Sequence, residues 1–240
     1  MLKVLAIDIE THDWKKPNDN AYGRVVQVAW ISYDQDEKEL DLECYYIKPD
    51  GFEISGKATY CHGITNEMAN EEGYTIQVVM KKLSTSLKTL QKNNGILIAH
   101  NIKFDVNGLA NEFQRLKMTN ELKVLNEVNK GDTWDPKHLR KYTLKYHQEQ
   151  LGRPPYTYDF YLERSYGLKL GEMLALVCPA HPDHKSLVKK AHTADADAKM
   201  CAMIYFQLCK CEIMASVHAV NNNTATLKGS KKRKSIETER

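Results

Sequence analysis

The segment Val4-Leu5-Ala6-Ile7-Asp8-Ile9-Glu10-Thr11 decides how the rest of the chain is organised. Its apolar run predicts a β-strand that is buried on both faces. Asp8 and Glu10 lie two residues apart at the end of this strand, so their side chains project from the same face. Neighbouring carboxylates repel each other unless a cation lies between them, and hard oxygen ligands of this kind suit Mg²⁺ or Mn²⁺. A strand that leaves the core for a polar loop explains an isolated pair more simply, so the interpretation depends on further acids downstream.

The composition is that of a globular protein with one sizeable domain. The chain has 240 residues, of which 42% are hydrophobic and 27% are charged, which is enough to bury a substantial core. It contains no apolar run of about eighteen residues and begins directly with the first strand, so we expect neither a membrane-spanning helix nor a secretory signal. Its six cysteines form no paired C-x-x-C pattern, which indicates reduced thiols. We therefore expect an intracellular protein, either cytoplasmic or located in the nucleus or nucleoid.

The basic charge is concentrated in the C-terminal tail. The formal net charge is +3, and residues 228–240 contain six basic and two acidic residues, which leaves a charge of −1 on the remainder of the chain. From residue 216 the sequence is polar and low in complexity, as is typical of a flexible segment. We therefore expect a folded domain at 1–215 and a flexible basic tail at 216–240. The tail could dock a polymerase or replication partner, bind nucleic acid or act as a nuclear-import signal.

The order of the predicted elements indicates an α/β fold. Residues rich in β-branched and aromatic side chains predict an antiparallel pair of strands beside the first one, and helical spacing of apolar residues predicts helices later in the chain. The predicted strands are 24–34, 40–49, 96–99 and a short one around 132–134, and the predicted helices are 75–90, 106–116, 168–177 and 194–215. Mixed parallel and antiparallel strands followed by helices predict a mixed sheet flanked by helices.

Two later segments add acids to the pair on the first strand. The motif His100-Asn101-x-x-Phe104-Asp105 follows a predicted buried strand, which places Asp105 about one turn into the next helix. The segment His192-Thr193-Ala194-Asp195-Ala196-Asp197 opens the last long helix, so a helical carboxylate lies beside an imidazole from the preceding loop. Asp195 and Asp197 point about 200° apart on a helix, so only one of them can face the other acids.

Taken together, these motifs resemble the DnaQ-like family of 3′–5′ exonucleases of the DEDDh type, which has an RNase H-like fold with a five-stranded mixed sheet. The resemblance is carried by Asp8-x-Glu10-Thr11, by His100-Asn101-x-x-Phe104-Asp105 and by His192-x-Ala194-x-x-Asp197. His62-Gly63-Ile64-Thr65 is similar to the substrate-contacting segment of many members, and Asp132-Thr133 is similar to their short strand after the second motif. The resemblance covers residues 1–210 in order and selects Asp197 over Asp195.

The resemblance implies a site residue by residue. Asp8 bridges two Mg²⁺ or Mn²⁺ ions, Glu10 and Asp197 complete the ion site that activates water, and Asp105 supports the second ion. His192 is the general base, because a neutral imidazole can accept the proton of the attacking water. The residues implied to contact the substrate are Thr11, Trp14, His62, Ile64, Thr65, His100, Asn101 and Phe104.

The function expected from this resemblance is hydrolysis at the 3′ end of single-stranded DNA, of the proofreading or repair type, with release of nucleoside 5′-monophosphates. RNA 3′-end trimming by the same residues is the alternative within the family. A nucleic-acid-binding or polymerase-accessory module without catalysis is the alternative from another class, although such a module would not need converging acids. No membrane partner is expected, and a homodimer is left open.

Three features depart from the family pattern or compete with it. His12, Asp13 and Trp14 replace the Thr-Gly-aliphatic start that commonly follows the first motif, and Trp14 is either a stacking residue for the terminal base or a surface aromatic. Cys178-x-x-His181-x-x-His184 could form half of a zinc site but lacks a second ligand pair, so a plain loop is the preferred interpretation. The basic and tyrosine-rich stretch 137–166 combines charges and rings as a nucleic-acid groove does, although helical packing explains most of its tyrosines.

Overall fold

A mixed five-stranded sheet forms the centre of the molecule. The computed structural model describes residues 1–13, 23–135, 137–138 and 168–214. The strands are β1 (Val4–Thr11), β2 (Val25–Tyr33), β3 (Glu39–Tyr46), β4 (Ile96–Ala99) and β5 (Asn129–Asp132), in the spatial order β3-β2-β1-β4-β5. β1 pairs antiparallel with β2 and parallel with β4, so the predicted mixed sheet with β1 at its centre is confirmed.

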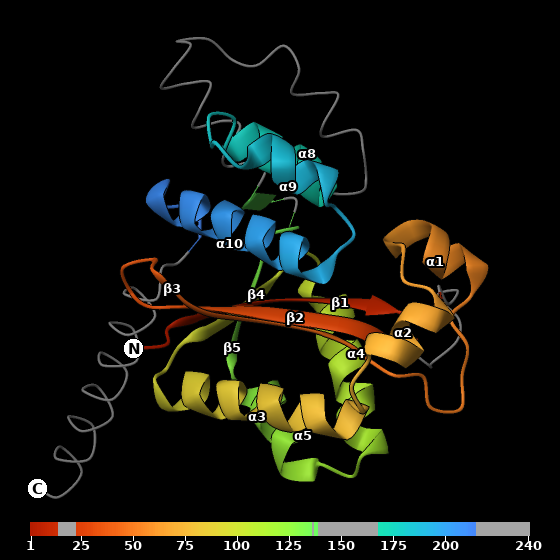
Figure 1. Cartoon of the computed structure of the whole chain (residues 1–240). Coiled ribbons are helices and arrows are strands. Elements are labelled where there is room, and N and C mark those ends of the chain that lie inside the picture. The colour runs from red at the N-terminus through yellow and green to blue at the C-terminus, as the bar shows by residue number, and fades with distance from the viewer. Residues whose placement is uncertain (14–22, 136, 139–167, 215–240) are drawn as a thin grey trace, which may run out of the picture.

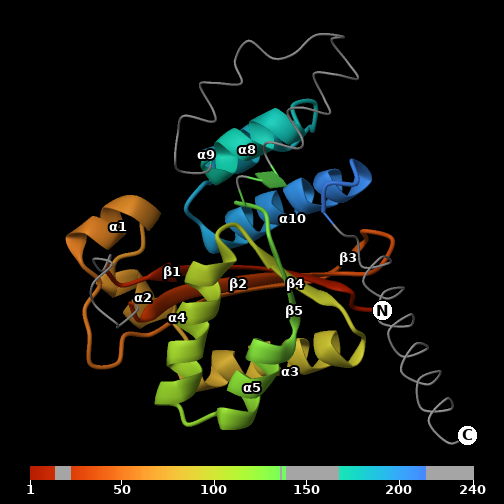
Figure 2. The same cartoon turned by 180° about the vertical axis from the view of Figure 1, so that it is seen from behind.

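Helices cover both faces of the sheet (Figure 1). On one face lie α3 (Ile76–Lys92), α4 (Ile102–Arg115) and α5 (Thr119–Glu127), and on the other lies α10 (Ala194–Lys210). α8 (Leu170–Val177) and α9 (His184–Lys189) lie against the outer side of α10, and the same layers are visible from behind (Figure 2). The short helices α1 (Gly56–His62) and α2 (Asn66–Glu72) lie at the end of the sheet where β1 finishes.

The alternation of side chains along β1 divides the core between the two faces. Leu5, Ile7 and Ile9 pack with the helices α3 to α5, whereas Val4 and Ala6 pack with α10. All five side chains are less than 4% exposed, and burying each of the larger ones contributes about 1.5–3 kcal/mol. Because Asp8 and Glu10 continue the even-numbered series, their carboxylates face the side of the sheet on which α10 lies.

Several predicted boundaries are wrong, each for a local reason. α4 begins at Ile102 rather than at 106, directly after Asn101 in a left-handed conformation (φ 70°), which the spacing of apolar residues does not reveal. β5 is formed by the polar residues Asn129–Asp132 rather than by 132–134, because pairing with β4 defines it and not its hydrophobicity. α10 ends at Lys210 rather than at 215, and the short helix α9 was not predicted. Within the described residues, no helix is long and apolar enough to cross a membrane.

Candidate active site and metal centre

The acid pair lies where β1 extends beyond its parallel neighbour. The pairing of β1 with β4 ends at Ala6 and Ile98, so Asp8 and Glu10 lie past the end of β4 while β2 still supports them on the other side. Both carboxylates are partly buried. This arrangement leaves the pair on a rigid strand with room beside it for residues from other elements.

Asp105 is held against β1 by a backbone hydrogen bond. It lies in the first turn of α4, is only 2% exposed, and its Oδ1 accepts the Ile9 N–H at 3.1 Å. One turn further along α4, Gly108 allows this close approach, because a Cβ atom there would lie 2.4 Å from Ile9 Cδ1. The structure therefore places Asp105 in the first turn of α4, as the sequence predicted, and against the end of β1.

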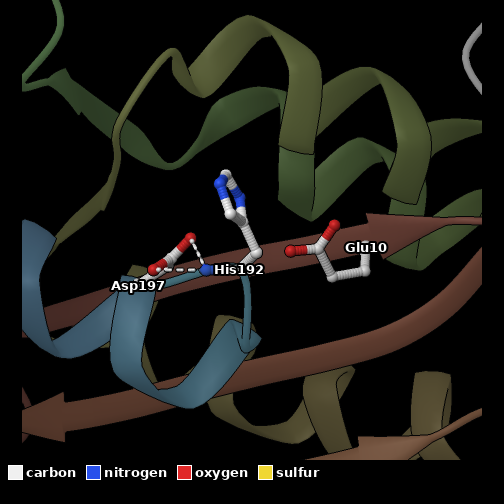
Figure 3. Close-up of side chains that lie close together, drawn as sticks. All are labelled: Glu10, His192 and Asp197. Carbon is white, nitrogen blue, oxygen red and sulfur yellow. Dashed lines mark hydrogen bonds between the residues drawn. The ribbon is translucent and has the colours of Figure 1, made fainter. Parts of the chain in front are cut away.

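Asp197 lies in the first turn of α10, and His192 lies in the loop just before this helix. The backbone N–H of His192 donates to both carboxylate oxygens of Asp197, at 3.3 and 3.2 Å, which fixes the carboxylate relative to the loop. His192 itself adopts a left-handed conformation with φ 71°, an uncommon one for a non-glycine residue. Its exposed ring projects between Asp197 and Glu10 (Figure 3).

Glu10, His192 and Asp197 form a group that could hold a metal ion. One ligand atom from each lies within 4.8 Å of the others, and no other such group was found among the residues that the structure describes. Burial, and then the charge of Asp197, raises the pKa of Glu10 to about 8. Burial also raises the pKa of Asp197 to about 7, although the hydrogen bond from His192 opposes this. Two oxygens and an imidazole nitrogen fit a divalent cation, which would offset the cost of ionising these acids.

Asp8 and Asp105 extend the acidic centre behind this group. Burial raises the pKa of Asp8 well above its ordinary value, and the charges of Asp105, Asp197 and Glu10 raise it further. Burial likewise raises the pKa of Asp105, while the hydrogen bond from Ile9 opposes the rise. The bond from Ile9 to Asp105 and the group formed by Glu10, His192 and Asp197 thus bring three separate segments together at the end of β1.

A family comparison decides which group of proteins this centre belongs to. The family model of the exonuclease family RNase_T matches residues 5–205, which include every residue of the acidic centre. The chain belongs to this exonuclease family. Exonucleases of the family depend on metal ions, in agreement with the ligand group formed by Glu10, His192 and Asp197.

Solved structures show that the exonuclease fold extends over most of the chain. The zinc-bound form of E. coli exonuclease I in complex with single-stranded DNA is 19% identical, with a TM-score of 0.62 over 88% of this chain and 41% of that chain. E. coli exonuclease I with a dT13 oligonucleotide is 20% identical with the same TM-score and coverage, and exonuclease I from Methylocaldum szegediense is 18% identical with a TM-score of 0.60. The present chain thus spans about two fifths of the length of these structures. No curated protein sequence gives a significant match.

His62 has both ring nitrogens engaged by the backbone. Nδ1 accepts the Ile64 N–H at 3.1 Å, so Nε2 carries the proton and donates to the Thr11 carbonyl at 3.3 Å. Burial lowers the pKa of His62, which keeps the ring neutral in this arrangement. His62 is 7% exposed and ties α1 to the end of β1, so a substrate could meet only the edge of its ring.

The other residues of the His-Gly-Ile-Thr segment also have structural contacts. Ile64 is 2% exposed and packs in a cluster with Ala58 and Ala69, and Thr65 caps α2 by accepting the Met68 N–H at 3.2 Å. Thr11 is buried and donates to the Asp13 carbonyl. The contact of these residues with a substrate stays a prediction, because the contacts given for them are all within the protein.

In the second motif, His100 and Asn101 form hydrogen bonds to other segments, and Phe104 is exposed. The Nε2–H of His100 donates to the Leu168 carbonyl at 3.0 Å, and Nδ1 lies 3.0 Å from the Thr133 hydroxyl. Burial lowers the pKa of His100. The Asn101 N–H donates to Asp132 Oδ1 at 2.9 Å. Phe104 is 40% exposed beside Asp105, which leaves its ring accessible to a substrate.

The structure bears on two of the alternatives left by the sequence, the choice between Asp195 and Asp197 and the possible zinc site. Asp197, and not Asp195, lies with Glu10 and His192 in the group that could hold a metal ion, whereas the charge of Asp195 acts on Cys44 and Tyr46 of β3 as well as on Asp197. Cys178, His181 and His184 form no metal-binding group in the part of the chain that the structure describes. Trp14, most of the stretch 137–166 and the tail 216–240 lie outside the described residues.

One buried carboxylate on α4, Glu112, was not predicted from the sequence; it binds β2 next to the acid pair. The register of β1 and β2 shifts between Glu10 and Thr11, which leaves Val26 as an extra residue on β2. Glu112, 1% exposed, accepts the Val25 N–H next to this bulge at 3.1 Å and forms ion pairs with Arg24 and Arg115. No pattern in the sequence links these residues, because the contact depends on how α4 crosses the sheet.

Proposed function

We propose that this chain is a metal-dependent 3′–5′ exonuclease that hydrolyses single-stranded DNA and releases nucleoside 5′-monophosphates. The observation that carries the proposal is the convergence of Asp8, Glu10, Asp105, Asp197 and His192 at the end of β1. Membership of the exonuclease family supplies the reaction class, and the direction of digestion and the substrate are the additional steps of the proposal.

The acidic centre fits two Mg²⁺ or Mn²⁺ ions held by Asp8, Glu10, Asp105 and Asp197. Their raised pKa values support this assignment, because burial and mutual repulsion disfavour the ionised carboxylates without a compensating positive charge. When bound, such ions stabilise the attacking and leaving oxygens of an in-line displacement at a phosphodiester.

His192 is assigned the proton transfer. Its exposed ring lies beside Glu10 and Asp197, where a water molecule held by these residues would lie within reach of a ring nitrogen. The imidazole accepts the proton of this water as the water attacks phosphorus, and the bond to the 3′ oxygen of the next nucleotide breaks. Because the backbone N–H of His192 is bound to Asp197, the acid also holds the base in position.

Single-stranded DNA is the preferred substrate because the similar solved structures include exonuclease I bound to single-stranded DNA and to a dT13 oligonucleotide. The exposed ring of Phe104 beside Asp105 offers a surface on which a terminal base could stack. RNA trimming is the alternative within the same chemistry.

The proposal is tested with DNA and RNA oligonucleotides of matched sequence, each labelled at either the 5′ or the 3′ end, in the presence of Mg²⁺ or Mn²⁺. The predicted result is a ladder of shortening products from 5′-labelled DNA and immediate release of labelled mononucleotide from 3′-labelled DNA. Faster digestion of RNA would replace the DNA assignment by the RNA alternative. Release of mononucleotides from the 5′ end, or internal cleavage, would overturn the proposed direction.

A further inference from the structure

The N-terminus of α10, where the site residues His192 and Asp197 lie, receives no side-chain cap from the preceding residue, Thr193. The first N–H groups of any helix have no partner within the helix, and the side chain of the residue before it usually supplies one. The Thr193 side chain makes no such bond; its hydroxyl donates backwards to the Lys190 carbonyl at 2.8 Å. The partner of the first α10 N–H must therefore come from elsewhere.

Gln27 of β2 supplies that partner. Its Oε1 accepts the N–H of Ala194, the first residue of α10, at 3.1 Å, although the two residues are 167 positions apart. Gln27 is 3% exposed and lies directly opposite Glu10 in the β1–β2 pairing. Cross-strand partners point to the same face of a sheet, so a single side chain connects the strand that carries Glu10 with the helix that carries Asp197.

Cys44 of β3 completes the connection. The Nε2 group of Gln27 donates to Cys44 Sγ at 3.5 Å, and the same sulfur accepts a backbone hydrogen bond from Asp195, the second residue of α10. The amide orientation is fixed, because reversing it would bring Nε2, a donor, against the Ala194 N–H. Two consecutive N–H groups of α10 are thus bound by side chains from two neighbouring strands.

The choice of an amide and a thiol is chemically suited to this place. An aspartate or glutamate is also a good partner for helix N–H groups. Such a residue would add another negative charge beside Glu10 and Asp197, which already repel each other. Gln27 and Cys44 provide acceptors without an additional charge.

We propose that Gln27, supported by Cys44, is a positioning residue that caps α10 from the sheet and sets Asp197 and His192 at the correct distance from Glu10. The cap itself depends only on the contacts described above, whereas its effect on catalysis rests on the proposed nuclease function. Displacement of a reacting group by about 1 Å can cost about a hundredfold in rate, so loss of the cap should affect turnover more than overall stability.

The test uses Gln27→Met, which keeps the side-chain volume and removes both hydrogen bonds. Amide hydrogen exchange at Ala194 and Asp195 should accelerate about five- to tenfold or more, as expected for a lost cap. The kcat should fall about ten- to a hundredfold with little change in the KM for an oligonucleotide, and the Mg²⁺ concentration needed for half-maximal rate should rise. Gln27→Glu retains the acceptor, so the Ala194 amide should stay protected.

Ile204→Val is the matched control, because it removes one methylene from the buried face of the same helix, far from its N-terminus. It should lower Tm and leave the kcat of the folded enzyme unchanged.

Unchanged amide exchange at Ala194 in Gln27→Met would overturn the proposed cap, whether or not the protein is a nuclease. Faster exchange with an unchanged kcat and Mg²⁺ requirement would overturn the positioning role. If Gln27→Met does not fold, Cys44→Ala provides the same comparison at the Asp195 amide, with the same two outcomes. A wild-type protein without nuclease activity would refute the proposed function, and the exchange result would still decide the cap.

Discussion

At the scale of single residues, the centre combines buried acids with one exposed base. Asp105 and Asp197 are 2% and 8% exposed, whereas His192 is exposed and close to Glu10 and Asp197. This division matches the proposed roles, because metal ligands gain from a dry, fixed environment and a proton acceptor must exchange its proton with solvent. Single substitutions can therefore test the metal-binding acids and the proton acceptor separately.

Replacing His192 with alanine should lower kcat by about 10² to 10⁴, the usual contribution of a positioned general base. The oligonucleotide affinity and the Mg²⁺ concentration for half-maximal rate should change little, because the carboxylates remain. Steady-state kinetics at several Mg²⁺ concentrations measure both quantities. His181→Ala, an exposed histidine in the loop between α8 and α9, serves as the control. A large rise in the Mg²⁺ requirement of His192→Ala would show that the ring is a metal ligand instead.

At the scale of elements, the site depends on how closely α4 and α10 approach β1. Gly108 brings α4 against Ile9, and the small residues Ala198, Cys201 and Ala202 bring α10 against the other face of the same strand. The acid pair between them therefore receives one carboxylate from each helix. A larger side chain at either helix–strand contact should displace the carboxylate that this helix contributes, although the substituted residue itself lies outside the acidic centre.

Gly108→Ala tests the α4 contact. The added Cβ would lie 2.4 Å from Ile9 Cδ1, and overpacking of this kind costs about 1–3 kcal/mol, more than the gain of up to about 1 kcal/mol in helix propensity. We expect a lower free energy of unfolding and a lower kcat, because the bond between Asp105 and Ile9 is displaced. Gly171→Ala in α8 is the control, since its nearest neighbour is Val188 at 3.6 Å and no loss of stability is expected. Chemical denaturation of both variants would show whether the tight contact exists.

The sequence predicted those elements whose composition reveals them. β1, the antiparallel partners and β4 follow from apolar and β-branched runs, and the three acid motifs follow from their spacing along the chain. β5 was placed wrongly because it is polar and is defined by its pairing with β4. The start of α4 was placed wrongly because hydrogen bonds to other segments fix its position. The roles of Gln27 and Glu112 could not be predicted, since each bonds a backbone group that only the tertiary fold brings near.

At the scale of the whole molecule, the acidic centre couples stability to pH and to divalent ions. Burial raises the pKa of Glu10 to about 8 and that of Asp197 to about 7, and it also raises the pKa values of Asp8 and Asp105. Ordinary carboxyl groups in an unfolded chain titrate near pH 4. Between these values the folded protein binds more protons than the unfolded chain, so its stability falls as pH rises.

The metal-free protein should therefore lose stability between about pH 5 and pH 8, and the contribution of Glu10 should be lost above its pKa of about 8. Excess Mg²⁺ should remove this decline, because the ion stabilises the ionised carboxylates of the folded state. Tm measured by calorimetry across this range, with chelator or with Mg²⁺, gives the comparison. Asp8→Asn should show a shallower decline in chelator. A metal-free Tm that rises steadily from pH 5 to pH 8 would contradict the predicted direction.

The central claim is that carboxylates from β1, α4 and α10 form one metal-dependent catalytic centre, and a comparison of two neighbouring substitutions in α10 tests it most directly. The Mg²⁺-dependent rate of mononucleotide release is measured for Asp197→Asn and for Asp195→Asn, after circular dichroism has shown that both fold. We predict that Asp197→Asn loses at least about 10³-fold in rate, since it removes a metal ligand, while Asp195→Asn, which lies outside the ligand group, keeps near-wild-type turnover. Near-wild-type turnover by Asp197→Asn would contradict the account.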